Sequence, residues 1–145
     1  MSISASLSIT LANRCNQSLS SIKIINSLLN NGWYLEKNNK IYYLPLGDDD
    51  DFDWQENQIN KDAFAEIVEQ KEQAGEIIGV GLTWGNTDIG VILLIYTNYQ
   101  LSFSLTINRK KLQSNITDFN WYLEKILPCL ETDFMTVSNF SFSQD

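Results

Sequence analysis

The fold class follows from residues 78–107, which read IGVGLTWGNTDIGVILLIYTNYQLSFSLTI. Two short polar segments divide this stretch into three apolar runs. In the first and third runs apolar residues alternate with small or hydroxylated ones, which is the period of a strand with one buried face. The middle run, Ile89 to Tyr96, is apolar almost throughout and predicts a central strand that is covered on both faces. Together the three runs predict an antiparallel meander.

Further strand signals lie on both sides of the meander. Apolar residues alternate with Ser and Thr from Ile3 to Leu11, which predicts another half-buried strand. Aromatic-rich runs at 33–35 and 41–44 flank an Asn-Asn pair at 38–39, and Asn tolerates the left-handed turn conformation. These runs therefore predict a hairpin. Residues 134–142 predict a final short strand or a docked tail.

Helical spacing of apolar residues predicts three helices. The first follows Ser18, the expected N-cap, and stops at Asn31-Gly32. The second runs from about residue 59 to 74 with Asn60 as a cap, and its expected outer face includes Lys71. The third runs from about residue 117 to 130, where Pro128 should kink or end it.

The element order is therefore β-α-β-β-α-β-β-β-α-β. This order predicts an α+β fold, with a mostly antiparallel sheet and about three helices packed on one face. A length of 145 residues is typical of one domain, and the sequence contains no repeat or linker. We therefore expect a single globular domain over residues 1–145.

Composition excludes several functional classes. The formal charge is −8, and a protein that binds nucleic acid by neutralising phosphates is expected to be basic. The chain has no histidine, so Ser-His-Asp and Cys-His nucleophile systems are excluded. Cys15 and Cys129 predict free buried thiols in a reducing compartment, with a single disulfide between them as the alternative. With no secretory signal and no long apolar run, we expect a cytoplasmic protein without membrane contact.

The acidity is concentrated in residues 48–76, which hold eleven acidic and two basic residues, whereas the rest of the chain sums to +1. Five aspartates within residues 48–53 repel one another, which favours a role other than stability. Two interpretations stay open: a solvated loop and helix face, or an anionic patch for a cationic partner. Phe52 and Trp54 are accordingly either pins that tie the loop to the core or interface anchors.

On the second interpretation, the partner-binding surface combines the aspartate-rich loop with the outer face of the second helix. Its charges steer association, and its aromatic rings supply desolvated contact area. The predicted partner-binding residues are Asp48, Asp49, Asp50, Asp51, Phe52, Asp53, Trp54, Glu56, Asp62, Glu66 and Glu69.

The aspartates of this loop do not make a convincing metal site. Asp49, Asp51 and Asp53 occupy positions 1, 3 and 5 of an EF-hand pattern, but Trp54 and Asn60 stand where that pattern requires Gly and Glu. Zinc is disfavoured because the chain has no histidine and only two, distant cysteines. We therefore predict no metal site.

Catalysis has equally little support. Asp88, Asp118 and Glu124 are available carboxylates, but their spacing singles out none of them. The glycines near residue 80 lack the phosphate-loop pattern, and small strand glycines more often let a bulky side chain pack closely. The basic cluster at 109–111 is typical of a solvated strand end. We predict no catalytic residue, no cofactor and no enzymatic activity.

In size, acidity and lack of catalytic machinery, the chain resembles bacterial immunity proteins. This resemblance implies that it binds a cognate, usually basic, toxin domain and blocks it by stoichiometric inhibition, with a nuclease-type toxin as the expected partner. Two alternatives stay open. One is an acidic adaptor or nucleic-acid mimic that regulates a host enzyme through the same surface. The other is a small ligand-binding domain or enzyme with a pocket between the sheet and the helices.

Overall fold

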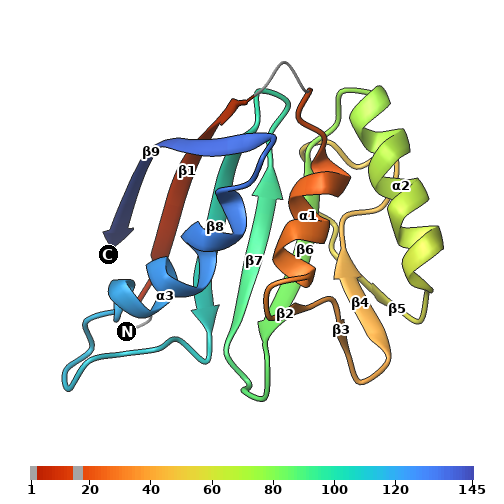
Figure 1. Cartoon of the computed structure of the whole chain (residues 1–145). Helices are drawn as coiled ribbons and strands as arrows, with labels where there is room; N and C mark the ends of the chain where they lie inside the picture. Colours follow the sequence, from red (N-terminus) through yellow and green to blue (C-terminus); the bar gives the residue numbers. More distant parts are fainter. Residues whose placement is uncertain (1–2, 15–17) are drawn as a thin grey trace.

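The computed structural model describes residues 3–14 and 18–145. A nine-stranded, mostly antiparallel sheet forms its centre, with helices on one side (Figure 1). Seven strands follow the order β3-β4-β6-β7-β8-β1-β9, while β2 pairs with β6 and β5 with β4. The elements are β1 (Ala5–Asn13), α1 (Ser21–Leu29), β2 (Trp33–Tyr34), β3 (Glu36–Lys37), β4 (Lys40–Tyr43), β5 (Gln55–Asn57), α2 (Lys61–Gln73), β6 (Ile78–Trp84), β7 (Gly90–Ile95), β8 (Gln100–Ile107), α3 (Phe119–Ile126), the 3₁₀ helix η1 (Leu127–Leu130) and β9 (Met135–Gln144). The predicted α+β class and element order are confirmed.

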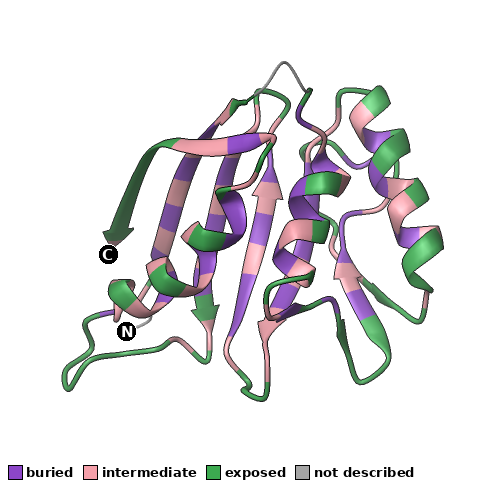
Figure 2. Ribbon diagram, in the orientation of Figure 1, coloured by how far each residue is buried: buried purple, intermediate pink, exposed green. Residues whose placement is uncertain are grey.

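The core lies between the sheet and the helices. Leu7, Phe103 and Leu93 stand side by side across β1, β8 and β7, and all three are fully buried. Their chain neighbours point to the opposite face, so buried and partly exposed residues alternate along the strands (Figure 2). This arrangement confirms the meander and the half-buried first strand.

The prediction that residues 89–96 are covered on both faces is wrong. On β7, Val91, Leu93 and Ile95 are buried under the helices, whereas Ile92 and Leu94 are partly exposed on the other face. The reason is that all the helices lie on one side of the sheet (Figure 1). An apolar run therefore marked the middle of the sheet correctly, but not a second covering layer.

The helix ends are set by side-chain caps. Asn60 caps α2 by accepting a hydrogen bond from the backbone N–H of Ala63, as predicted. On α1 the cap is Ser20, two residues after the predicted Ser18. Helix α3 ends at Ile126, and the chain continues as a 3₁₀ turn because Pro128 lacks a backbone donor.

The predicted hairpin forms, with a change in its first half. Asn38 and Asn39 both adopt positive φ, 54° and 64°, and connect β3 to β4. The aromatic run at Trp33–Tyr34 pairs instead with β6, as strand β2. Residues 55–57, which fall in the predicted acidic connection, form the short strand β5 beside β4.

Lys71 corrects the predicted outer face of the second helix. Its side chain is 1% exposed and lies on the buried side of α2 with Phe64 and Val68. The ammonium group finds three acceptors in the loop that precedes the helix and at its end. A buried charge is tolerated when it is paired in this way.

The described cysteine, Cys129, lies buried in η1. Burial raises the pKa of its thiol to about 11, so the thiol is protonated and unreactive at neutral pH. Cys15 lies outside the described residues. Among the helices that the structure describes, none combines the length and the apolar character needed to cross a bilayer.

Candidate functional site

The acidic loop, residues 45–54, is organised around the carboxylate of Asp48. Its Oδ1 accepts hydrogen bonds from the backbone N–H groups of Asp51 and Phe52 at 3.1 and 3.0 Å, and its Oδ2 accepts one from Asp53 at 2.7 Å. Asp48 is buried. Of the predicted partner-binding residues, Asp48 is thus the one that the structure places inside the fold.

Lys71 fastens the acidic loop to α2 from beneath. Its Nζ donates to the carbonyl oxygens of Pro45 at 2.9 Å and Asp48 at 2.6 Å, and it pairs with Glu76 at 3.0 Å. Glu76 also accepts the N–H of Gly47 at 2.9 Å. With the base of the loop held by these bonds, its conformation is set by the chain itself.

Phe52 is held in an unfavourable backbone conformation at the outside of this loop. Its φ is +52°, which is rare for a bulky residue, and its side chain is 42% exposed. The N–H bond to Asp48 is part of what maintains the conformation. Strain of this kind, which costs of order 1–3 kcal/mol, is often found where a functional group must be presented.

Trp54 has the opposite role and ties the acidic loop to the sheet. Its ring stacks on Tyr42, with centroids 4.8 Å apart and planes 5° from parallel. A Cβ on Gly79 would lie 2.6 Å from the Trp54 ring and 2.7 Å from Leu44, so β6 needs glycine at this point. Of the two roles predicted for the loop aromatics, Trp54 has the geometry of a pin and Phe52 that of an anchor.

The remaining predicted acids are spread over the acidic loop, α2 and β5. Asp50, Asp51 and Asp53 are exposed on the acidic loop, while Asp49 is exposed but accepts a hydrogen bond from the N–H of Ile77. The exposed side of α2 carries the three acids of the helix that were predicted to bind a partner, which are Asp62, Glu66 and Glu69.

The loop meets α2 at the C-terminal end of the helix, through Lys71. Asp62 lies in the first turn, nine residues away, which is about 13 Å along a helix. Glu56 lies neither on the acidic loop nor on α2. It is on β5, directly opposite Tyr42 of β4, and lines the open face of the sheet. Burial and, next, the nearby Glu56 carboxylate raise the pKa of the Tyr42 phenol.

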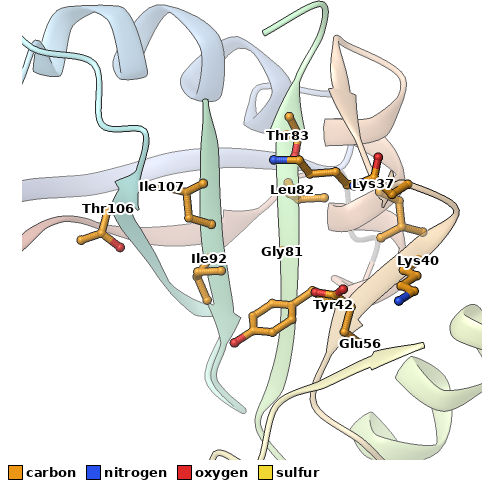
Figure 3. A pocket seen from close by; sticks show the side chains of 12 residues that line it. Lys37, Lys40, Tyr42, Glu56, Gly81, Leu82, Thr83, Ile92, Thr106 and Ile107 are labelled. Carbon is orange, nitrogen blue, oxygen red and sulfur yellow. The ribbon is translucent and has the colours of Figure 1, made fainter. Parts of the chain in front are cut away.

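A groove of about 540 Å³ lies on the open face, between the β3–β4 hairpin and strands β6 to β8 (Figure 3). It opens because β4 pairs with β6 through one residue pair, Tyr43 and Val80, so the hairpin splays away. The Tyr42 ring lies across β6 at Gly81 and points toward Ile92 (Figure 3). This position on the open face differs from the sheet-helix pocket of the predicted alternative.

Two lysines at the edge of this groove were not predicted as site residues. Lys37 and Lys40 are directly opposite each other across the β3–β4 hairpin and line the groove. Neither forms an ion pair with a described residue. The signal was present in the sequence Lys-Asn-Asn-Lys, because a two-residue turn brings its flanking residues together.

Two of the three carboxylates considered for catalysis have structural partners. Asp118 accepts the N–H of Trp121 and so caps α3, and Glu124 accepts a hydrogen bond from Asn120. Arg109, in the basic cluster, donates to Thr117 and to the carbonyl of Asn115. Within residues 3–14 and 18–145 no cluster of three or more acids or cysteines is arranged to hold a metal ion.

Neither a family model, nor a curated protein, nor a solved structure matches the chain.

Proposed function

We propose that this chain is a non-catalytic binding protein that docks its acidic loop onto a cationic surface of a protein partner. The observation that carries the proposal is Phe52, an exposed ring on a positive-φ backbone, between the exposed carboxylates of Asp51 and Asp53. Asp48 and Lys71 fix the loop from inside. A surface that is ordered before binding loses less conformational entropy when the complex forms.

The division of labour within the loop follows from its chemistry. Exposed carboxylates attract a basic partner over several ångströms and raise the association rate. An aromatic ring that becomes buried in the complex slows dissociation, as interface hot spots do. Phe52 thus takes the anchor role, and Trp54 supports it by pinning the end of the loop to Tyr42.

Within this proposal, the favoured partner is a basic, nuclease-type toxin domain, so the chain acts as a bacterial immunity protein. The acidic loop then covers the surface where the toxin holds nucleic-acid phosphates. The support is the resemblance in size, charge and composition together with the preformed anionic loop. An acidic adaptor or nucleic-acid mimic would use the same loop on a host enzyme, and a toxin gene directly upstream would decide for immunity.

The test begins with capture of partners from the source cells by the immobilised full chain, at graded salt concentrations. Association and dissociation rates of the purified partner are then measured for variants. Replacing Asp50, Asp51 and Asp53 with Asn should lower the on-rate about tenfold or more and flatten its salt dependence. Phe52→Ala should raise the off-rate about 30-fold, which corresponds to about 2 kcal/mol.

A matched control removes the same number of charges elsewhere, by replacing Asp88 and Asp133 with Asn and Glu124 with Gln. All three are exposed and lie outside the acidic segment. This variant should bind with an on-rate within about twofold of the wild type, since steering depends on charges near the contact. If control and loop variants lose binding equally, net charge is responsible and the acidic loop is not the docking surface.

A second candidate function is the binding of a small anionic ligand in the groove. Like charges directly opposite each other destabilise a hairpin, and a bound anion would relieve the repulsion between Lys37 and Lys40. Tyr42 and Ile92 offer an apolar wall beside them. Titration with benzoate, followed by NMR, should shift these four residues saturably, and the shifts should vanish in a Lys37→Met, Lys40→Met variant. Linear, non-saturating shifts would contradict this function.

A further inference from the structure

Strand β9 forms an edge of the sheet that lacks most of the usual protection. It is ten residues long, and β1 is its one neighbour among the described residues. Its sequence, MTVSNFSFSQ, contains no charged residue and no proline. Natural edge strands usually carry lysines, prolines or bulges that prevent pairing with another chain. One bulge is present, opposite Thr10 and Leu11, and it leaves residues 139–144 in continuous register beyond it.

The ladder with β1 shows which backbone groups of this segment are available. Ser4 and Asp145 exchange hydrogen bonds in both directions, at 3.3 and 2.8 Å. Because bonded and non-bonded pairs alternate in an antiparallel ladder, Ser143, Ser141 and Asn139 also bond toward β1. The intervening residues, Phe140, Phe142 and Gln144, therefore direct their N–H and C=O groups outward.

Exposed apolar side chains gather at the same edge. Phe140 and Phe142 are 42% and 48% exposed, and the inner face of Phe142 stacks on Phe119 with centroids 4.1 Å apart. Leu112 and Ile116 are 55% exposed and precede Thr117, whose N–H is bonded to the Gln144 side chain at 2.7 Å. Of the seven large hydrophobic residues that are exposed in the described part of the chain, four thus belong to β9 or to the loop tied to it. Such concentrations mark interaction sites.

The charge distribution indicates which partner fits this edge. The acidic segment 48–76 contributes to β5 and α2, at the end of the molecule opposite to β9 (Figure 1). Two copies that approach through β9 therefore keep their like-charged segments apart. A strand without charge offers nothing specific to a strongly charged partner, whereas antiparallel pairing of identical strands generates the two-fold symmetry of most homodimers.

We infer that β9 pairs antiparallel with β9 of a second copy, about a two-fold axis at Ser141. In this register Phe140 lies opposite Phe142 of the second copy, and the outward N–H and C=O groups of both residues form four intermolecular hydrogen bonds. The neighbouring registers place a phenylalanine opposite Gln144 or Ser138 and leave rings exposed. Cross-strand aromatic pairs stabilise a sheet. The contact is small, so we expect a dissociation constant on the order of micromolar.

The register can be tested by disulfide trapping. In this register residue 141 of one copy lies opposite residue 141 of the other, as a non-hydrogen-bonded pair. The Cα atoms of such a pair are about 4.5 Å apart, which is within the range that a disulfide spans. In a Cys15→Ser background, Ser141→Cys should give a covalent dimer on mild oxidation. Ser143→Cys is the matched control and should give at least fivefold less, because its two copies lie about 13 Å apart along the strands. Equal yields, or no dimer from Ser141→Cys, would overturn the inference.

The dimer itself is tested without an introduced cysteine. Sedimentation velocity of the full chain should show a concentration-dependent monomer–dimer equilibrium. Phe140→Lys should weaken the dimer at least tenfold, because it places two charges in the interface. Tyr34→Lys, at an exposed aromatic on β2, should leave the equilibrium unchanged. A wild-type chain that stays monomeric up to about 1 mM, or a Phe140→Lys variant that dimerises normally with native circular dichroism, would refute the proposal, which does not depend on the proposed function.

Discussion

The two ends of the sheet use polar groups in opposite ways. At the β4–β5 end, charges serve the fold: Lys71 is buried with three oxygen acceptors, and Asp48 is buried with three backbone donors. At the β9 end, a strand without any charge leaves its outer backbone groups unpaired among the described residues and its phenylalanines exposed. The buried polar groups of the first end pair within one chain, whereas the outer backbone groups of the second are, in our proposal, paired by another copy.

This difference shows that the number of charges in a segment does not measure the charge of its surface. Residues 48–76 carry a net charge of −9 in the sequence. Four of their acids bind backbone groups of the fold or the buried lysine, since Asp48 accepts loop amides, Asp49 accepts the N–H of Ile77, Glu72 accepts the N–H of Ser21 and Glu76 pairs with Lys71. Fewer carboxylates are therefore available to a partner than the sequence indicates. The buried Asp48 holds the backbone of two of the exposed ones, Asp51 and Asp53.

The largest effect should follow from Lys71→Met, which keeps most of the length of the side chain and removes the ammonium. The carbonyls of Pro45 and Asp48 and the carboxylate of Glu76 then lose their shared donor. Breaking a buried charge pair by removing one partner is strongly destabilising, so we expect a loss of about 3 kcal/mol in the free energy of unfolding. Urea denaturation at neutral pH measures it.

Lys61→Met is the matched control for this variant. Lys61 is the first residue of the same helix and is exposed. Its replacement should change the free energy of unfolding by no more than about 0.5 kcal/mol, as for most surface substitutions. If the two variants lose equal free energy of unfolding, the hydrogen bonds of Lys71 to the acidic loop make no specific contribution to stability.

A smaller loss, about 2 kcal/mol, is expected for Trp54→Ala, because the ring is half-buried on Tyr42 and Gly79. Phe52→Ala should cost no more than about 0.5 kcal/mol, since its ring makes no stacking contact within the described chain. Thermal or urea unfolding of the two variants measures these losses and distinguishes the ring that supports the fold from the ring that is free to contact a partner. A stable Trp54→Ala variant beside an unstable Phe52→Ala variant would reverse the two roles.

The sequence was sufficient to predict the long strands β1, β6, β7 and β8, because alternation has a direct physical cause, but it did not predict β5 or the pairing of β2 with β6. It could not show which faces are covered, since the apolar run of β7 occurs both in double-sided and in single-sided sheets. Only the placement of all helices on one side leaves Ile92 and Leu94 partly open. The same limit hid the groove, which depends on how far the β3–β4 hairpin splays from β6.

The local structure of the acidic loop was predicted in part, whereas its role as a binding site stays a prediction. The sequence indicated that Phe52 and Trp54 are each either a structural pin or an interface anchor. Assigning the roles required knowing that the Trp54 ring packs over Gly79. Lys71 was misplaced although its position is three residues after the buried Val68 and seven after Phe64, which is the buried stripe of α2. A lysine in that stripe is normally taken for a surface residue, and its acceptors come from a loop whose path the sequence does not reveal.

Phe52→Gly should stabilise the protein by about 1 kcal/mol, because glycine adopts positive φ without the steric cost that Phe52 bears. The same variant removes the proposed anchor, so it should bind the partner less tightly while unfolding at higher urea. A variant that gains stability and loses affinity would show that the backbone strain at Phe52 serves binding and not folding. A variant that is less stable than wild type would show that the Phe52 ring supports the loop.

The smallest effect concerns the start of β9 and depends on pH. Hydrogen bonds from the N–H of Val137 and the hydroxyl of Thr136, and then the nearby Arg14, lower the pKa of the Glu131 carboxyl from its ordinary value of 4.5. A carboxyl with a lowered pKa in the folded state stabilises the fold above its unfolded pKa, and this contribution is lost as the pH falls through the folded pKa. The free energy of unfolding of the wild type should therefore fall by a few tenths of a kcal/mol below about pH 4.5, a loss that Glu131→Gln does not show. The effect is small because the group is exposed.

Thr136→Val should remove part of the same pH dependence. Urea titrations of all three chains between about pH 3 and 6 measure it. If the free energies of unfolding of wild type and Glu131→Gln change equally with pH, the ion pair and hydrogen bonds of Glu131 contribute nothing to stability at the start of β9.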